Sequence, residues 1–124
     1  MAQDSDINRR RFPRLNTGPD YGLHVWVGGQ LLEGAHLQNI SAVGCALQLP
    51  ILAVGGIENG TSLEPLYLDH EALPFVPLGG TVVWVLGRHA GRTSGYVLLG
   101  VEFRIITPMV QRLIGQHVEE EAGG

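Results

Sequence analysis

The sequence predicts a mainly β protein, a six-stranded antiparallel β-barrel with a C-terminal α-helix, and three features of the chain lead to this fold class. Apolar and polar residues alternate with a period of two in several short stretches, as in strands that bury one face. Glycine-rich, turn-like segments separate these stretches. A single amphipathic helical pattern follows the last of them. A small barrel with the helix packed at one end accommodates this order of elements.

Five stretches are predicted to be strands, and a sixth is weaker. The period-two pattern covers residues 23–27, 31–37, 43–49, 81–87 and 96–105. A hairpin turn at residues 28–30 joins the first two, and Gly34 in the second predicts a β-bulge. Residues 50–62 form a glycine-rich connection, and Pro65 just after it limits any strand there to an edge of the sheet.

The end of the chain predicts a helix. Thr107 can cap it, and Pro108 suits the first helical position. The expected apolar stripe consists of Val110, Leu113, Ile114, His117 and Val118. We therefore expect a flexible tail over residues 1–8, a single domain over 9–118 and a frayed acidic end over 119–124.

Basic residues are concentrated near the start of the chain. All eight are arginines, and four of them lie in the sequence RRRFPR at residues 9–14. The whole chain has a net charge of −4, so the remainder carries −8. Because nucleic-acid-binding proteins spread their basic residues along a groove, this distribution indicates a small local target and no nucleic-acid partner.

Composition excludes several other classes of protein. With 44% hydrophobic and 16% charged residues, the chain is not expected to be disordered as a whole. Its longest apolar run, at residues 49–54, is too short to span a membrane, and the polar N-terminus lacks the apolar core of a signal peptide. We therefore expect a cytoplasmic protein with no membrane partner, in which the single Cys45 is a small core residue.

No residue pattern predicts catalysis or a cofactor. The five histidines lack metal-ligand spacing and companion cysteines, so we expect surface or half-buried side chains. Nucleophile motifs of hydrolases are absent. Gly55 and Gly60 have the spacing of a phosphate-binding P-loop, but Thr61 stands where that motif requires lysine. The sequence therefore favours a binding protein over an enzyme, with no metal and no cofactor.

Two polar motifs remain. In residues 9–14, each arginine can donate two parallel hydrogen bonds to phosphate or to guanine O6 and N7, and can stack on aromatic rings. The stretch NISAVG at residues 39–44 offers an amide for a base edge, a hydroxyl for a phosphate or ribose, and a glycine where a ligand can approach. Alone, the first motif is better explained as a solvated basic tail, and the second as an ordinary strand end.

Together, Arg-x-x-x-Arg at residues 10–14 and Asn-x-Ser-x-x-Gly at residues 39–44 resemble the paired signature of the PilZ domain family. The sequence LLGVEFRIITP at residues 98–108 is similar to that family's last barrel strand and the start of its C-terminal helix. The resemblance extends over about residues 9–118. It implies a six-stranded barrel that binds the bacterial second messenger cyclic di-GMP and catalyses no reaction.

The resemblance implies a ligand-binding role for three arginines. Arg10 and Arg14 would hold guanine edges and phosphates. Arg9 matches the position just before the motif, where in the family an arginine accompanies a stacked pair of ligand molecules. It therefore implies two cyclic di-GMP molecules per chain.

The resemblance also implies that Asn39, Ser41 and Gly44 line the barrel face where one guanine lies. The family accepts Asp or Asn at the first position, and the neutral Asn39 lacks a charge-assisted hydrogen bond, which implies a lower affinity. Trp84 on the penultimate strand has two interpretations. Its apolar neighbours favour a core side chain, and the alternative is stacking on a guanine, as an aromatic residue does in some relatives.

The expected function is that of a stand-alone sensor in bacterial second-messenger signalling, for example in motility or biofilm control. Cyclic di-GMP would order the N-terminal arginine segment, which would signal to an unknown downstream protein. The alternative is a ligand-independent protein-interaction barrel, as in PilZ relatives that serve pilus or motility control. Such relatives typically lack the arginines or the second motif, and this chain has both, which favours sensing.

Overall fold

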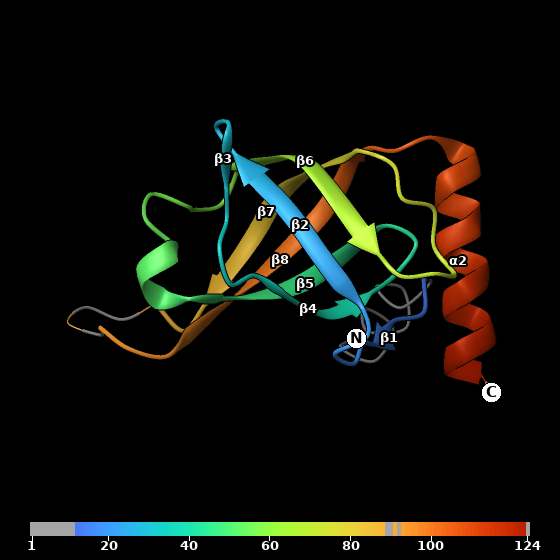
Figure 1. Cartoon of the computed structure of the whole chain (residues 1–124), viewed down its shortest axis with the longest axis horizontal. Helices are drawn as coiled ribbons and strands as arrows, with labels where there is room; N and C mark the ends of the chain where they lie inside the picture. Colours follow the sequence, from blue (N-terminus) through green and yellow to red (C-terminus); the bar gives the residue numbers. More distant parts are fainter. Residues whose placement is uncertain (1–11, 89–90, 92, 124) are drawn as a thin grey trace, which may run out of the picture.

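The computed structural model describes residues 12–88, 91 and 93–123. Its elements are β1 (Leu15–Asn16), β2 (Gly22–Val27), β3 (Gln30–Leu31), β4 (His36–Ile40), β5 (Gly44–Pro50), η1 (Ile51–Ala53), β6 (Ser62–Asp69), β7 (Leu78–Leu86), β8 (Tyr96–Ile105) and α2 (Pro108–Gly123). Antiparallel strands and one C-terminal α-helix confirm the predicted mainly β class (Figure 1). No helix of the described part is long and apolar enough to cross a bilayer. The tail predicted over residues 1–8 lies outside the described residues.

Within the described residues, the strands form one eight-stranded sheet in the order β1-β4-β5-β8-β7-β6-β2-β3. All paired neighbours are antiparallel. The six longer strands form the middle of the sheet, and the two-residue strands β1 and β3 are its edges. Closure of this sheet into a barrel stays a prediction, because no pairing among the described residues joins β1 to β3.

The sheet buries one of its faces in a single hydrophobic core. Val25, Leu47, Leu63 and Leu99, each from a different strand, are fully buried there. Helix α2 stands across one end of the sheet and adds Ile114 to the same core (Figure 1). Because side chains alternate along a strand, the outward positions of the same strands are free to form a site.

The helix begins where the sequence predicts. The Val110 backbone N–H donates to the Thr107 hydroxyl at 3.2 Å, so Thr107 is the cap. Ile114 is fully buried, but Leu113 is 41% exposed, so its assignment to the apolar stripe is wrong. Residues 119–123, where we expect fraying, continue the helix.

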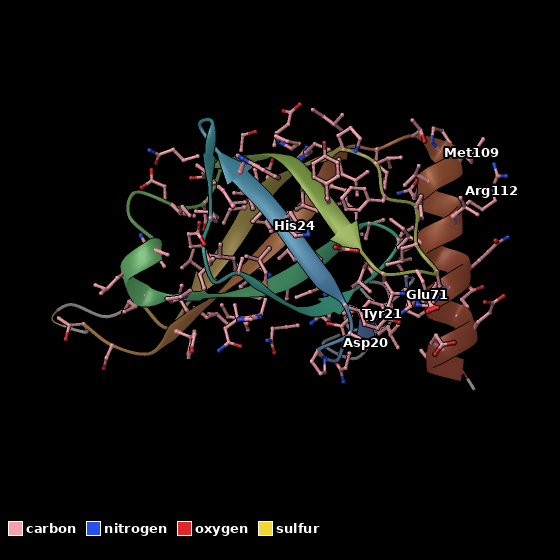
Figure 2. The ribbon with its side chains drawn as sticks, viewed as in Figure 1. Asp20, Tyr21, His24, Glu71, Met109 and Arg112 are labelled. Carbon is pink, nitrogen blue, oxygen red and sulfur yellow. The ribbon has the colours of Figure 1, made fainter. Side chains whose placement is uncertain are left out.

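A cluster of three rings, Tyr21, His70 and His117, joins α2 to the rest of the domain, and Figure 2 labels Tyr21 beside the helix. His117 is only 7% exposed, and its Nε2 lies 2.6 Å from the Tyr21 hydroxyl. Tyr21 stacks on His70 with 4.0 Å between ring centroids, and His70 Nε2 lies 3.4 Å from Asp20. Burial, and then the charges of Glu121 and Asp20, raise the pKa of the Tyr21 phenol. The expectation of surface or half-buried histidines is therefore wrong for His117.

Two strand predictions are wrong. Strand β6 lies between β7 and β2, although Pro65 predicts an edge strand. Its register with β7 shifts between Leu63 and Leu66, so Pro65 falls in an irregular part of the ladder where it displaces no regular hydrogen bond. Gly34 lies in the turn between β3 and β4 with a φ of 78°, which glycine adopts readily. The predicted strand over residues 31–37 is therefore the end of one strand and the start of another.

Candidate functional site

Four adjacent strands place one residue each in a row across the outer face of the sheet. Asn39 of β4 pairs with Ala46 of β5. Gly100 of β8 pairs with Ala46 on one side and with Trp84 of β7 on the other. Residues in register on neighbouring strands share a face, and this face is opposite to the core residue Leu47. Asn39 and Trp84 thus flank a floor made of two small residues.

Trp84 lies across Gly100. A Cβ atom at Gly100 would collide with the indole ring, so glycine is required for the ring to take this place. The register shift between Val82 and Trp84 separates the half-buried ring from Val82, which is buried in the core. The favoured interpretation of Trp84 as a core side chain is therefore wrong.

The motif at residues 39–44 includes the tight turn between β4 and β5. The Ser41 N–H donates to the Gly44 carbonyl oxygen at 2.8 Å, and the Val43 N–H donates to the Ser41 hydroxyl at 3.2 Å. A side chain at Gly44 would collide with the Val101 carbonyl oxygen of β8. Ser41 and Gly44 therefore shape the turn and let β8 approach it closely.

A pocket of about 160 Å³ opens over this row. Its lining includes the five predicted binding residues that the structure describes, Arg14, Asn39, Ser41, Gly44 and Trp84. Pairing of Asn16 with Asn39 places Arg14, two residues earlier, at the pocket. Arg14 and Asn39 also border a neighbouring pocket of about 420 Å³. Arg9 and Arg10, the other predicted site residues, lie outside the described residues.

Seven of the lining residues were missed by the sequence analysis, namely Val43, Cys45, Ala46, Val83, Gly100, Val101 and Glu102. Three of these, Ala46, Gly100 and Glu102, occupy the outward positions between the apolar core positions of β5 and β8, and this alternation is the signal that could have found them. Glu102 accepts a hydrogen bond from Arg104 at 2.8 Å, so its carboxylate charge is partly balanced at the pocket.

The pocket offers hydrogen-bonding groups and an aromatic face. Arg14 supplies a guanidinium, Asn39 both a donor and an acceptor, and Trp84 a flat ring. Cys45 also borders the pocket but is buried, and burial raises the pKa of its thiol to about 12, which keeps it protonated. In the described ranges, no three His, Cys, Asp or Glu side chains are grouped so as to hold a metal ion. The arrangement suits a planar ligand with hydrogen-bonding edges and negative charge.

Fold and pocket together define a class, a small antiparallel β domain with a polar pocket on the outer face of its sheet. The family model for the PilZ domain matches residues 8–120, and the chain belongs to the PilZ domain family. This match confirms the resemblance seen in the two motifs. No curated protein matches the sequence.

Solved structures share the fold at low sequence identity. The PilZ domain of YcgR from Escherichia coli, solved with c-di-GMP, matches with a TM-score of 0.65 and 16% identity over 93% of this chain and 98% of that one. The K. pneumonia MrkH–c-di-GMP complex has a TM-score of 0.70 and 19% identity, over 92% of this chain and 52% of that one. The Bacillus subtilis inhibitor of motility (MotI/DgrA) matches with a TM-score of 0.66 and 18% identity, over 92% of this chain and 51% of that one. The chain thus spans about half the length of MrkH and MotI.

Replacing Gly44 with alanine is expected to lower the free energy of unfolding by about 1–3 kcal/mol, because the added methyl group would push β8 away from the turn. Chemical denaturation measures the change. The control is Gly56→Ala, whose Cβ would have no atom within 4 Å, and we expect it to alter stability by less than about 1 kcal/mol. Equal stability of the two variants would contradict the close approach of β8.

Proposed function

We propose that this protein is a sensor that binds cyclic di-GMP at the pocket on the outer face of the sheet. The observation that carries the proposal is that Arg14, Asn39 and Trp84, which are far apart in the sequence, line this one pocket. Membership of the PilZ domain family supports the same ligand, as do the similar folds of YcgR and MrkH, which were solved with c-di-GMP.

The lining of the pocket suits a guanine base. Guanine presents the acceptors O6 and N7, which the Arg14 guanidinium or the Asn39 amide can meet. Its N2 amino group is a donor, for which the Glu102 carboxylate is an acceptor. The indole of Trp84 offers a stacking surface, and base–aromatic stacking is worth about 1–3 kcal/mol. One guanine can therefore form hydrogen bonds along its edges while its face stacks on Trp84.

The pocket takes one base of the ligand, because its volume of about 160 Å³ is well below that of sites for whole small molecules, about 300 Å³ or more. We assign the phosphates and the second guanine to Arg10 together with Arg14, whose forked guanidinium groups suit both.

We assign a second ligand molecule to Arg9. In calorimetry, a ratio of two molecules per chain that falls towards one in Arg9→Ala would support this assignment, and a ratio of one in the unmodified protein would reject it.

Binding also orders the arginine segment at residues 9–14 over the pocket. Four like charges in this segment repel one another, and the two phosphates of the ligand offset that repulsion. Ordering about ten residues costs on the order of 10 kcal/mol of backbone entropy, so the net affinity is moderate. The ordered segment presents a changed surface, which a downstream protein reads.

Arg14→Ala is expected to weaken cyclic di-GMP binding by about ten- to a hundredfold, because a bidentate contact worth about 1–3 kcal/mol is lost. Isothermal titration calorimetry measures the affinity. Arg10→Ala should weaken binding by a similar factor. Arg14→Lys should recover little of the lost affinity, because lysine keeps the charge but lacks the forked guanidinium group. Arg112 is exposed on α2 outside the pocket lining, so Arg112→Ala is the matched control and should bind as the unmodified protein does (Figure 2).

The result that contradicts sensing is a lack of any calorimetric response to excess cyclic di-GMP. A protein-interaction domain that needs no ligand would then be the better account of the fold. An equal loss of affinity in Arg112→Ala and Arg14→Ala would instead reject the assignment of this pocket.

Trp84→Ala is expected to weaken binding by about tenfold through loss of stacking, and Trp84→Phe should retain part of the affinity. Fluorescence gives a second measurement, since a stacked guanine should quench the Trp84 indole. The chain has a second tryptophan, Trp26, so a Trp26→Phe background isolates the signal. Unchanged emission and unchanged affinity in the two Trp84 variants would exclude stacking while leaving binding possible.

Ordering of the N-terminal segment predicts that amides over residues 5–14 exchange hydrogen more slowly when cyclic di-GMP is bound, whereas residues 15 and 16 already pair with β4 as strand β1. Mass spectrometry of the exchanged peptides, with and without ligand, measures this protection. Strand β8 provides the internal reference, because its core pairing with β5 and β7 should be equally protected in both states. Equal protection of residues 5–14 in both states would reject the switch even where binding is established.

A further inference from the structure

Four rings form a continuous surface on the outer face of β2 and β6 and on the loop that follows β6. We call this surface the aromatic strip, and it consists of His24, Trp26, Tyr67 and Phe75. Tyr67 stacks on Phe75 with centroids 4.9 Å apart and 25° between the ring planes. Trp26 meets Tyr67 edge-on at 6.0 Å, and His24 meets Phe75 edge-on at 6.3 Å. Figure 2 shows His24 on the face of β2 that is turned towards the viewer.

The aromatic strip faces away from the core. Val25, which lies between His24 and Trp26, is fully buried, so its two neighbours point outward. Phe75 is 59% exposed although its side chain is large and apolar. Stacked and edge-to-face contacts hold the rings in one arrangement, so the surface is preorganised. An exposed patch of contacting aromatic rings is typical of an interaction site.

The aromatic strip is separate from the cyclic di-GMP pocket proposed above. None of its four residues lines that pocket. Its strands, β2 and β6, follow β7 in the sheet order, whereas the floor of the pocket is formed on β5 and β8. A ligand in the pocket and a partner on the strip could therefore be bound at the same time.

The surroundings of the aromatic strip are acidic. No arginine or lysine occurs in the sequence between Arg14 and Arg88, so strands β2 to β7 carry no basic side chain apart from histidine. Asp69 and Glu64 are exposed on β6, the strand that also carries Tyr67. His24 Nε2 lies 3.1 Å from Asp69 Oδ2, which ties the strip to one of these carboxylates.

We propose that the aromatic strip is a docking surface for a partner protein segment that carries arginine. A guanidinium can stack on the exposed ring faces while it donates hydrogen bonds to Asp69 or Glu64. Nucleic acid and anionic membranes would meet carboxylates here with no basic residue to attract them, which disfavours both. The surface thus combines aromatic anchors with a charge opposite to that of the partner.

The first test uses hexa-arginine as the probe, titrated into the full-length chain at physiological salt. Two-dimensional NMR is expected to show shifts of the backbone amides of β2 and β6 and of the Trp26 indole N–H. Hexa-lysine should bind about fivefold more weakly, because an ammonium group does not stack in the same way. Equal affinity for the two peptides, or shifts centred on another surface, would overturn the proposal.

Variants of the aromatic strip give the second test. Phe75→Ser removes the most exposed ring, and Asp69→Asn removes one charge while keeping the shape of the side chain. Each is expected to weaken hexa-arginine binding by about fivefold. Tyr96→Ser and Glu33→Gln are the matched controls, since both residues are exposed elsewhere and should leave the affinity unchanged. Loss in the controls equal to that in the variants would mean general attraction to an acidic protein and would overturn the proposal.

Two further measurements distinguish other occupants. Sedimentation that shows a dimer of the unmodified chain, lost in Phe75→Ser, would assign the aromatic strip to a second copy of this protein. Pelleting with vesicles of anionic phospholipid, lost in the same variant, would assign it to a membrane. Either result would overturn the proposed arginine-bearing partner, and a monomer that does not pellet would support it.

Discussion

A side chain at Gly44 would occupy the space of the Val101 carbonyl oxygen, and one at Gly100 would occupy the space of the Trp84 ring. Protein interiors are packed so closely that an added methyl group must displace its neighbours. The lack of these two side chains therefore determines both how near β8 comes to the β4–β5 turn and where the aromatic face lies. The pocket lies where two small residues, Ala46 and Gly100, stand in register between Asn39 and Trp84.

The residues of the signature motif divide into those that build the pocket and those that remain available to a ligand. Ser41 uses its hydroxyl to accept the Val43 N–H, and Gly44 provides clearance for β8. Asn39 and Arg14 keep hydrogen-bonding groups at the pocket. A loss of binding on mutation of Ser41 would therefore report a distorted turn as readily as a lost ligand contact, whereas Arg14 and Trp84 test the ligand itself.

The sequence predicted the parts of the fold that depend on local pattern, and it failed where distant packing decides. The alternation of apolar and polar residues in β7 and β8 and the Thr107 cap could be predicted, because each depends on residues that are neighbours along the chain. Strand β6 was missed as an inner strand because an irregularity in its pairing with β7 accommodates Pro65. Trp84 was misjudged because a shift of register, invisible in the sequence, turns it outward. The two motifs predicted four lining residues, but Gly100 and Glu102 required knowledge of which strands are neighbours.

Cys45 is the only cysteine of the chain, and it lies buried at the border of the pocket. Burial raises the pKa of its thiol to about 12, and reagents that modify cysteine react with the thiolate. We therefore expect the folded protein to react slowly with such reagents, because its thiol is buried and protonated. A cysteine introduced at an exposed position, for instance in place of Leu52, would then be the more reactive thiol. A fluorophore or spin label can be attached at a chosen point in this way while the native residue at the border of the pocket stays in place.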